Sequence, residues 1–467
     1  MAGGIGRHLD ELVVVVPGIL GSRLTRVDED GSRHEIWGTT TGVLLKNLVT
    51  FGHRVQRLTI RPGDNPDAPA DGIIPTGLIS DFQLIPGFTG IAGYDGLVER
   101  LRLDNGLRED QVIGFAYDWR LSNRVNGRKL AEFLDREVGR WRASTKKSDS
   151  RAVLICHSMG GLVARWCTER EQGYELVSRT ITIGTPYKGA VMALDALVNG
   201  VQLPKHLGPR FDDLVRSLPS VRELLPTYAC VKSGGELKCL DQVDILPSDW
   251  VSQGLGFHHE LAEAVRSRDP KRTDALDAFR GGLQPTLTSA SLGLDRTLTV
   301  YESWDGSAAG ENYRGDGTVP RDSATPPEWS NQAWSKAVAQ RHAKMQLAPS
   351  VQTELNVILT DAPRPMSAGA QIGMRLPRAV PAGQSFDVTG YGPSGLGLTA
   401  VVDSLDGTAG QLRKMAKTDG EGSYRMRIEP LPAGRYDITI ARSSSTSALV
   451  DEVSDTLLVF SGTGAGD

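Results

Sequence analysis

The segment Ile155-Cys-His-Ser-Met-Gly-Gly161 holds the residue best suited to covalent chemistry. It joins a short apolar run to an amphipathic stretch, which is the setting of a nucleophile elbow, a strained turn that lifts a serine hydroxyl above a sheet. Gly160 is the small residue that the turn requires, whereas Cys156 stands where the common G-x-S-x-G motif has glycine. We therefore predict that Ser158 is a nucleophile for acyl transfer; the competing interpretation is an ordinary turn that contains serine.

A serine hydroxyl becomes an effective nucleophile beside an imidazole whose tautomer a carboxylate holds. In hydrolases with such an elbow, the acid and then the histidine follow the serine along the chain. Seven of the eight histidines precede or adjoin Ser158, or lie in a region that we interpret as an insertion: His8, His34, His53 and His157, then His206, His258 and His259. His342 remains, and we predict that it is the base.

Two aspartates compete for the role of the acid. Asp316 lies in the turn Gly315-Asp-Gly-Thr-Val-Pro320, between a predicted late strand at 296–303 and His342. Asp305 follows that strand directly, where a minimal α/β-hydrolase carries its acid. Asp-Gly pairs are also common in plain turns, so residue types and spacing leave the choice open.

Backbone amides are expected to bind the oxyanion of the tetrahedral intermediate. The residue after the nucleophile, Met159, supplies the first amide. The glycine-rich turn Pro17-Gly-Ile-Leu-Gly-Ser22 offers a second, for which the Ile19 amide is the best candidate. The alternative for this turn is a simple strand ending.

These candidates depend on alternating strands and helices. The run Leu12-Val-Val-Val-Val16 is typical of a strand buried on both faces, and similar strands are predicted at 111–117, 152–157 and 179–183. Amphipathic helices are predicted at 94–101, 129–141 and 159–171. This alternation predicts an α/β-hydrolase with a mainly parallel sheet covered by helices.

Two departures from the alternation suggest further parts of the molecule. Residues 193–292 contain short helical stretches separated by Gly, Pro and Ser, and we expect an inserted cap or lid there. Residues 1–360 then form the catalytic domain, 361–365 a linker, 366–462 an all-β immunoglobulin-like sandwich and 463–467 a disordered tail. The sandwich strands are predicted at 371–376, 386–390, 398–403, 412–418, 424–429, 435–440 and 454–460.

Composition narrows the classes of function. The chain has 467 residues, of which 39% are hydrophobic and 23% charged, as in a folded two-domain protein. A formal net charge of -4 disfavours nucleic acid as a partner. No metal site or cofactor is predicted. Cys156 and Cys167 are expected to be small buried residues, whereas Cys230 and Cys239 flank a segment whose ends could meet in a disulfide.

Membrane contact is expected to be peripheral. The first apolar run has five residues and lacks the basic segment and cleavage site of a secretory leader. No run approaches the roughly 20 apolar residues of a membrane-spanning helix. We therefore expect a cytoplasmic protein that could contact a lipid surface through its lid.

Several segments resemble the lecithin:cholesterol acyltransferase family, which includes phospholipid:diacylglycerol acyltransferases and a lysosomal phospholipase with transacylase activity. They span residues 12 to about 350, and Tyr117-Asp-Trp-Arg120 is the most specific of them. We favour a structural role for that motif, in which Arg120 pairs with Asp118. The other similar segments are Val16-Pro-Gly-Ile-Leu-Gly-Ser22, Ile36-Trp37, Pro86-Gly87 with Tyr94, His157-Ser-Met-Gly160, Gly184-Thr-Pro186 with Gly189, and Gly315-Asp-Gly-Thr-Val319.

The resemblance implies Ser158 as nucleophile, Asp316 rather than Asp305 as acid, and His342 as base. It implies an oxyanion hole made by the Ile19 and Met159 amides, and cap or membrane-contacting elements beyond Ala193 and around Trp37. The substrate implied is a lipid ester. The carboxyl-terminal sandwich lies outside the resemblance.

Three functions follow as hypotheses. The first is a serine-dependent lipid acyl hydrolase or O-acyltransferase that acts on phospholipid or acylglycerol esters. The second is an esterase for soluble or polymeric esters, with the sandwich as a targeting module for a protein or glycan partner. The third is an inactive binding protein on a degenerate hydrolase, which the full set of Ser158, Asp316 and His342 disfavours.

Overall fold

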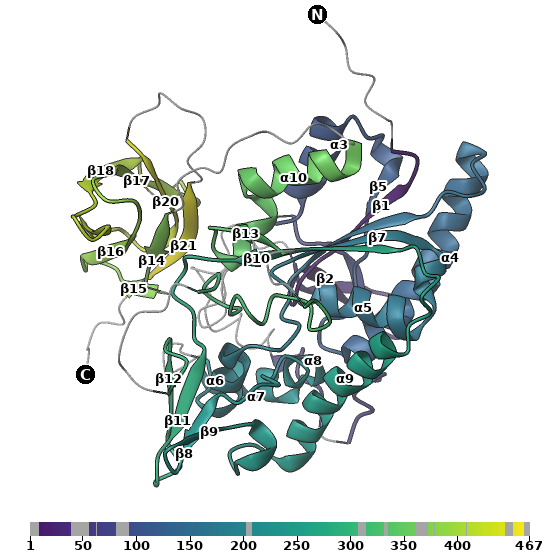
Figure 1. Ribbon diagram of the computed structural model, residues 1–467, viewed down its shortest axis with the longest axis horizontal. Coiled ribbons are helices and arrows are strands. Elements are labelled where there is room, and N and C mark those ends of the chain that lie inside the picture. Colours follow the sequence, from purple (N-terminus) through teal and green to yellow (C-terminus); the bar gives the residue numbers. More distant parts are fainter. Residues whose placement is uncertain are drawn as a thin grey trace, which may run out of the picture.

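The centre of the molecule is a six-stranded sheet in the order β13-β10-β7-β6-β1-β5, in which every pairing is parallel (Figure 1). Its strands are β1 Leu12–Val16, β5 Val112–Gly114, β6 Ala152–His157, β7 Val177–Ile183, β10 Ala275–Gly281 and β13 Lys336–Val338. The computed structural model describes residues 9–38, 56–61, 63–80, 93–201, 208–306, 314–330, 335–360, 372–377, 379–407, 409–443 and 452–461.

Helices cover both faces of this sheet. Helices α3 (Asp95–Asn105) and α10 (Pro349–Thr360) lie on one face, and α4 (Asn123–Thr145) and α5 (Gly160–Arg170) on the other (Figure 1). Every residue of β1 and β6 is buried, because a strand covered on both faces gains from an apolar side chain at each position. The predicted α/β-hydrolase architecture is confirmed.

Residues of the region expected to form a lid pair with the following strand β12 in a separate sheet, in the order β12-β11-β8-β9. Its strands and the adjoining helices are β8 Val231–Ser233, β9 Glu236–Lys238, β11 Ser289–Leu292, β12 Leu298–Tyr301, α6 Val191–Val198, α7 Gly208–Ser217, α8 Pro219–Arg222 and α9 Ser248–Arg266. Figure 1 shows these elements together, below the central sheet in that view.

Two strands differ from the sequence-based expectation. The segment at 296–303 does not return to the central sheet, because it forms β12 of the smaller sheet. The central strand is β10, although it falls inside residues 193–292. Only the last four residues of β10 are buried, and Asp277 and Arg280 interrupt its apolar pattern, so it lacks the continuous hydrophobic run of β1.

A three-stranded antiparallel sheet in the order β3-β2-β4 was not predicted. It consists of β2 Ser22–Val27, β3 Arg33–Trp37 and β4 Ile73–Leu78. Trp37 ends β3 with 4% of its surface exposed and packs edge-on against Trp119, with 5.6 Å between ring centroids. The Trp37 side chain is therefore a core residue.

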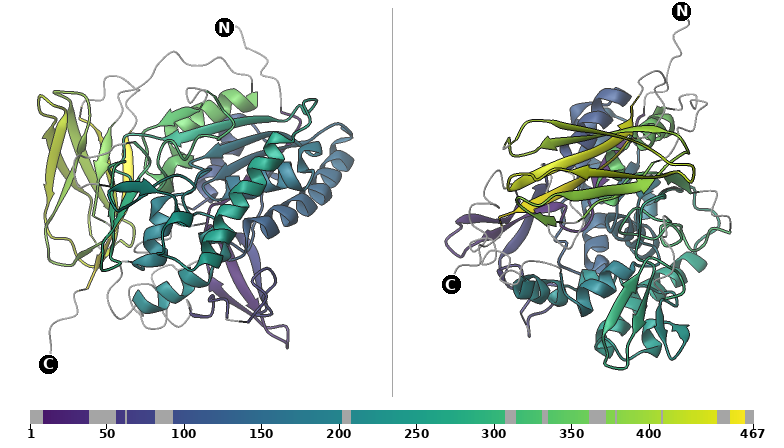
Figure 2. Two further views of the ribbon diagram at one scale, coloured as in Figure 1. Left: turned by 60° about the horizontal axis from the view of Figure 1, so that its bottom comes forward. Right: turned by 90° about the vertical axis from the view of Figure 1, so that its left-hand side faces the viewer.

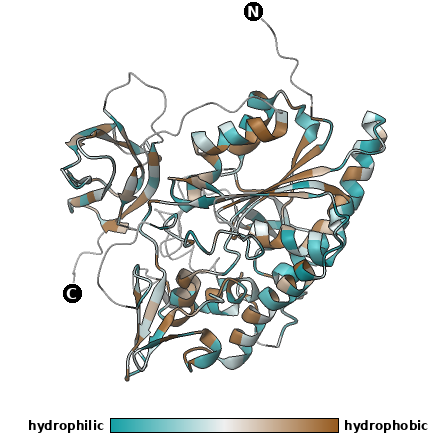
Figure 3. Ribbon diagram, in the orientation of Figure 1, coloured by the Kyte–Doolittle hydropathy of each residue, from teal (hydrophilic) through white to brown (hydrophobic). Residues whose placement is uncertain are grey.

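The carboxyl-terminal residues form two packed sheets with a hydrophobic core of their own (Figure 2). The residues of β19 are alternately exposed and buried. Figure 3 accordingly shows both hydrophilic and hydrophobic residues along the strands of this region. All seven predicted strands are present, and β15 is additional. One sheet holds β14 Gly373–Arg375, β16 Phe386–Tyr391 and β19 Ser423–Ile428; the other holds β15 Ala379–Pro381, β17 Gly397–Ser404, β18 Leu412–Lys417, β20 Gly434–Arg442 and β21 Val453–Phe460.

All four cysteines are free thiols. The backbone N–H of Cys230 donates to the carbonyl of Lys238 at 3.1 Å, so the ends of the intervening segment do meet, as the hairpin β8–β9, without a disulfide. The predicted linker at 361–365 and the tail at 463–467 lie outside the described residues. Within the described part of the chain, no helix combines the length and apolarity needed to cross a bilayer.

Candidate active site

Ser158 occupies the sharp turn between β6 and α5. Its φ of 54° lies in the left-handed region, which is strained for a residue with a side chain. A Cβ at Gly160 would come within 2.4 Å of the Pro17 carbonyl oxygen, so only glycine lets α5 approach the end of β1 this closely. Cys156 is fully buried in β6 and burial raises the pKa of its thiol well above its usual range, so it is an inert core residue.

The structure brings Ser158, His342 and Asp316 together in one hydrogen-bonded row. His342 Nε2 lies 2.8 Å from Ser158 Oγ, and His342 Nδ1 lies 2.8 Å from Asp316 Oδ2. Asp316 is fully buried, and Ser158 and His342 are 8% and 4% exposed. A carboxylate next to Nδ1 favours the tautomer with hydrogen on Nδ1, which leaves a lone pair on Nε2 facing the serine hydroxyl.

Asp316 is held rigidly in this row. Its Oδ1 accepts hydrogen bonds from the backbone N–H groups of Thr318 at 2.9 Å and Val319 at 2.7 Å. A Cβ at Gly281, the last residue of β10, would lie 2.2 Å from the Asp316 Cβ, so Asp316 packs directly on the end of that strand. Asp305, its rival, is exposed.

The glycine-rich turn after β1 lies against Ser158. A Cβ at Gly18 would come within 2.9 Å of the Ser158 Cβ, and Leu20 has a φ of 65°. Trp37 Nε1 donates to the Leu20 carbonyl at 2.8 Å and so fixes the turn. Ile19 lines the cavity beside Ser158, and Met159 is the N-cap residue of α5. The amides of these two residues remain the predicted oxyanion donors.

A second hydrogen-bonded chain joins this turn to the segment of His342, and sequence analysis did not predict it. The Gly18 N–H donates to Tyr94 Oη at 2.7 Å, Tyr94 Oη lies 2.9 Å from His157 Nδ1, and His157 Nε2 lies 2.9 Å from the His342 carbonyl. A carbonyl oxygen can only accept, so His157 Nε2 carries the hydrogen. Nδ1 of the neutral ring then has no hydrogen and accepts from the Tyr94 hydroxyl. Burial, and then the nearby His342, lower the pKa of His157 to about 3, so the ring is neutral.

The motif Tyr117-Asp-Trp-Arg120 braces the same turn from the other side. Arg120 pairs with Asp118 through two hydrogen bonds, of 2.9 and 2.7 Å, as expected. The Tyr117 hydroxyl donates to the Pro17 carbonyl at 2.8 Å, and Trp119 Nε1 donates to the Ser22 carbonyl at 3.2 Å. The motif therefore has a structural role: its side chains hold the backbone of the turn, and the turn itself contacts Ser158.

The cavity beside Ser158 is small, about 60 Å³. Its walls come from the turn after β1, from α6 and α8, and from the loop after Asp316. Most of the lining side chains are apolar: Ile19, Leu20, Pro186, Ala190, Met192, Ala193, Val221, Leu224, Val319 and Ala343. An acyl chain fits the chemistry of these walls.

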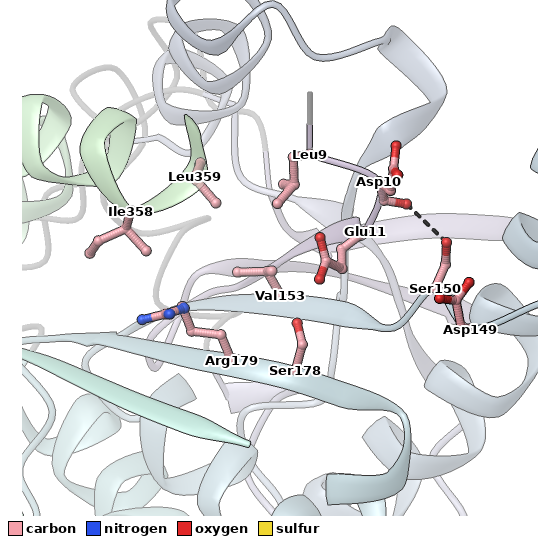
Figure 4. A pocket seen from close by; sticks show the side chains of 10 residues that line it. All are labelled: Leu9, Asp10, Glu11, Asp149, Ser150, Val153, Ser178, Arg179, Ile358 and Leu359. Carbon is pink, nitrogen blue, oxygen red and sulfur yellow. Dashed lines mark hydrogen bonds between the residues drawn. The ribbon is translucent and has the colours of Figure 1, made fainter. Parts of the chain in front are cut away.

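A larger hollow of about 370 Å³ lies at the opposite, amino-terminal end of the central strands (Figure 4). It has three carboxylates, two serines and one arginine among its lining residues, which are Leu9, Asp10, Glu11, Asp149, Ser150, Val153, Ser178, Arg179, Ile358 and Leu359. Arg179 pairs with Asp277. No histidine lines this hollow. The described residues also contain no group of three or more His, Cys, Asp or Glu side chains placed to hold a metal ion.

Comparison with known proteins agrees with the geometry. The sequence model of the family described as lecithin:cholesterol acyltransferase matches residues 88–353. Lecithin-cholesterol acyltransferase-like 4 of Arabidopsis thaliana is 26% identical over 235 residues, which span 46% of this chain and 42% of that protein, less than half of its length.

Solved structures are similar in fold. A chain of the Tle4-Tli4 complex superposes with a TM-score of 0.50 at 15% identity, over 74% of this chain and 97% of that one. The propeptide form of Bacillus licheniformis lipase BlEst2 gives a TM-score of 0.36 at 13% identity, over 97% and 95%. With more than half of its residues matched by the family's sequence model, the chain belongs to the lecithin:cholesterol acyltransferase family.

Proposed function

We propose that this protein is a serine-dependent acyl hydrolase or O-acyltransferase that works through an acyl-enzyme. Ser158 Oγ attacks the ester carbonyl while His342 Nε2 takes its proton, and the imidazolium then gives that proton to the leaving alcohol. The Asp316 carboxylate accepts the Nδ1–H hydrogen bond and stabilises the imidazolium. The observation that carries the proposal is the buried row Ser158–His342–Asp316, with hydrogen bonds of 2.8 Å on both sides of the imidazole.

The Ile19 and Met159 amides are proposed to bind the oxyanion. Both residues adjoin Ser158, one along the cavity wall and one at the start of α5, where the helix dipole also favours negative charge. Water or an acceptor alcohol then releases the acyl group. The choice between these two acceptors decides whether the enzyme is a hydrolase or a transferase.

The substrate proposed is a lipid ester, a phospholipid or an acylglycerol. The apolar lining of the cavity and the name of the Arabidopsis relative support this class. A cavity of about 60 Å³ holds only a few methylene groups, so a long acyl chain requires the elements of the cap to move. An esterase for soluble esters would need no such movement, and this difference makes the two hypotheses separable.

We also propose a division into two domains. Helix α10 ends at Thr360 and β14 begins at Gly373, and the residues on either side belong to separate hydrophobic cores. The catalytic domain then comprises residues 1–360 and the sandwich 366–462.

The test of the mechanism is covalent labelling. A fluorophosphonate probe should label wild-type protein at Ser158 and leave Ser158→Ala unlabelled. Ser178→Ala is the matched control, because Ser178 lies at the other end of the sheet and should label like wild type. Equal labelling of wild type and Ser158→Ala would refute the assignment of the nucleophile.

The test of the substrate is lipid profiling. Incubation of phospholipid and acylglycerol vesicles with wild-type protein should produce lysolipid or free fatty acid, and Ser158→Ala should produce neither. Addition of a long-chain alcohol should divert acyl groups to a new ester if the enzyme is a transferase. Faster turnover of a soluble short-chain ester than of vesicles would instead favour the esterase.

A further inference from the structure

The β-sandwich forms hydrogen bonds and ion pairs with residues on both sides of His342, the proposed base. Arg341 immediately precedes His342, and its Nε donates to Asp455 Oδ2 of β21 at 2.8 Å. Both side chains are about nine-tenths buried. Arg341 also packs over the residue after the acid, since a Cβ at Gly317 would lie 2.8 Å from the Arg341 Cζ. One ion pair therefore joins the sandwich to the segments of both His342 and Asp316.

The neighbouring residues add backbone contacts. Gln340 Oε1 accepts from the Ser454 N–H at 3.1 Å, and Gln340 Nε2 donates to the Glu452 carbonyl at 3.3 Å. Lys344, two residues after His342, forms an ion pair with Asp437 of β20. The chain from Gln340 to Lys344 is thus held to two adjacent strands of the sandwich.

A separate contact reaches the acid from the other sheet. Gln284, fully buried, accepts from the Met374 N–H at 2.9 Å and donates to the Ile372 carbonyl at 3.3 Å. Gln284 in turn forms a β-bridge with Asp316, and its own N–H donates to the Gly315 carbonyl at 3.0 Å. Strand β14 is therefore connected to Asp316 through a single side chain.

We propose that the carboxyl-terminal sandwich is a positioning element for Asp316 and His342, in which Arg341, Gln340 and Gln284 are the positioning residues. This inference rests on the proposed function, because it assumes that these two residues act on Ser158. A detachable targeting module would contact the catalytic domain away from the reacting groups. Here the contacts converge on the segments of the acid and base, where a displacement of about 1 Å can cost roughly 100-fold in rate.

A second ion pair across the same interface provides a matched control. Arg375 of β14 pairs with Glu302, the residue after β12, at 2.7 Å. Glu302 directly follows the small cap sheet and adjoins neither Asp316 nor His342 in the chain. Loss of this pair weakens the attachment of the sandwich without releasing the segments of the acid and base.

The experiment compares full-length Arg341→Ala, Arg341→Lys and Glu302→Gln proteins. Two quantities are measured: kcat and KM on a soluble short-chain ester, and the second-order rate of fluorophosphonate labelling, which reports activation of Ser158 without substrate binding. Arg341→Ala should lower kcat and the labelling rate roughly 10- to 100-fold with KM within about twofold. Arg341→Lys, which keeps a cation facing Asp455, should recover part of this loss, and Glu302→Gln should stay within about twofold of wild type.

Three outcomes would overturn the proposal: wild-type kcat in folded Arg341→Ala protein, a rise in KM with kcat unchanged, or an equal loss in Glu302→Gln. If Arg341→Ala does not fold, Asp455→Asn replaces it, since this change keeps the side-chain shape and removes the charge. Failure of the proposed function has a different signature, because wild-type protein would then not react with the probe at all.

Discussion

The two ends of the central sheet each carry a hollow, and the smaller one holds the proposed active site. The amino-end hollow of about 370 Å³ contains serines and carboxylates, among them Ser178 and Asp149, whereas the cavity beside Ser158 measures about 60 Å³. Only the smaller one combines its serine with an imidazole and a buried carboxylate in hydrogen-bonding order. Alignment of a few polar groups, and not volume or the presence of suitable residue types, therefore distinguishes the two ends.

The direction of the strands explains this difference. In a parallel sheet, all strands deliver their carboxyl ends to one edge, where loops and helix N-termini gather. Here β1 leads to Gly18, β6 to Ser158, β10 to the packing surface of Asp316, and β13 to His342. The opposite edge receives the carboxyl ends of helices, and Ile358 and Leu359 of α10 line the hollow there (Figure 4).

The largest expected effect is on kcat, and it distinguishes Asp316 at the carboxyl end of the central sheet from Asp149 at the amino end. Asp316→Asn should lower kcat on an ester roughly 10⁴-fold, because an amide in place of the carboxylate favours the wrong tautomer of His342. Asp149→Asn, in the amino-end hollow, should leave kcat within about twofold. Steady-state kinetics with thermal melts of both variants make the comparison. A mild effect of Asp316→Asn on folded protein would contradict the assignment of the acid.

A smaller effect is expected from a hydroxyl at each end. Tyr94→Phe removes the partner of the Gly18 N–H and of His157 Nδ1, both buried, which should cost about 1–3 kcal/mol in the free energy of unfolding. Gly18 belongs to the glycine-rich turn at 17–22, which carries the proposed oxyanion donor Ile19, so kcat should also fall, roughly 10-fold. Ser150→Ala removes a hydroxyl that donates to the Asp10 carbonyl at 3.1 Å.

The Asp10 carbonyl keeps another hydrogen-bond donor, Trp141 Nε1 at 2.8 Å. Ser150→Ala should therefore lower the free energy of unfolding by less than about 1 kcal/mol and leave kcat unchanged. Denaturant titrations and ester kinetics measure both effects. Equal losses in the two variants would mean that the Tyr94 hydroxyl has no special role.

A third effect concerns stability at acid pH. Burial lowers the pKa of His157 to about 3 and that of His258 to about 4, below the ordinary value near 6.5 of the unfolded chain. Between these values the unfolded state binds more protons, so the free energy of unfolding should fall as pH falls below about 6.5. Each histidine contributes up to about 1.4 kcal/mol per pH unit.

Urea titrations at pH 8, 6 and 5 measure this slope. His157→Gln should make the slope less steep than that of wild-type protein. A wild-type stability that rises toward pH 5 would show that His157 is protonated in the folded state. Its bond to Tyr94 would then need another explanation.

Much of the site could be predicted from local sequence. The elbow around Ser158 and the runs that became β1 and β6 have short-range patterns, because a buried parallel strand and a tight turn each restrict residue type position by position. Chain order was enough to select His342. The seven sandwich strands also followed from alternation and turns.

Other features depended on residues far apart in the chain. Spacing could not choose between Asp305 and Asp316, because the choice depends on which turn packs on the end of β10. The segment of β12 was expected in the central sheet, and β10 lies among residues that were expected to form the cap, because the strand with which a segment pairs depends on residues far away in the chain. The chain from Gly18 through Tyr94 and His157 joins three separate segments.

The sequence by itself was enough to propose the kind of chemistry, through the types and order of Ser158 and His342, and to predict the two fold classes along the chain. Only the tertiary structure decided which groups hold that chemistry in place, from the bracing of the oxyanion turn to the ion pair between Arg341 and Asp455, 114 positions apart. The physical reason is that backbone preferences and hydrophobic periodicity act between near neighbours. Hydrogen bonds between side chains depend on distances that only the packed core sets.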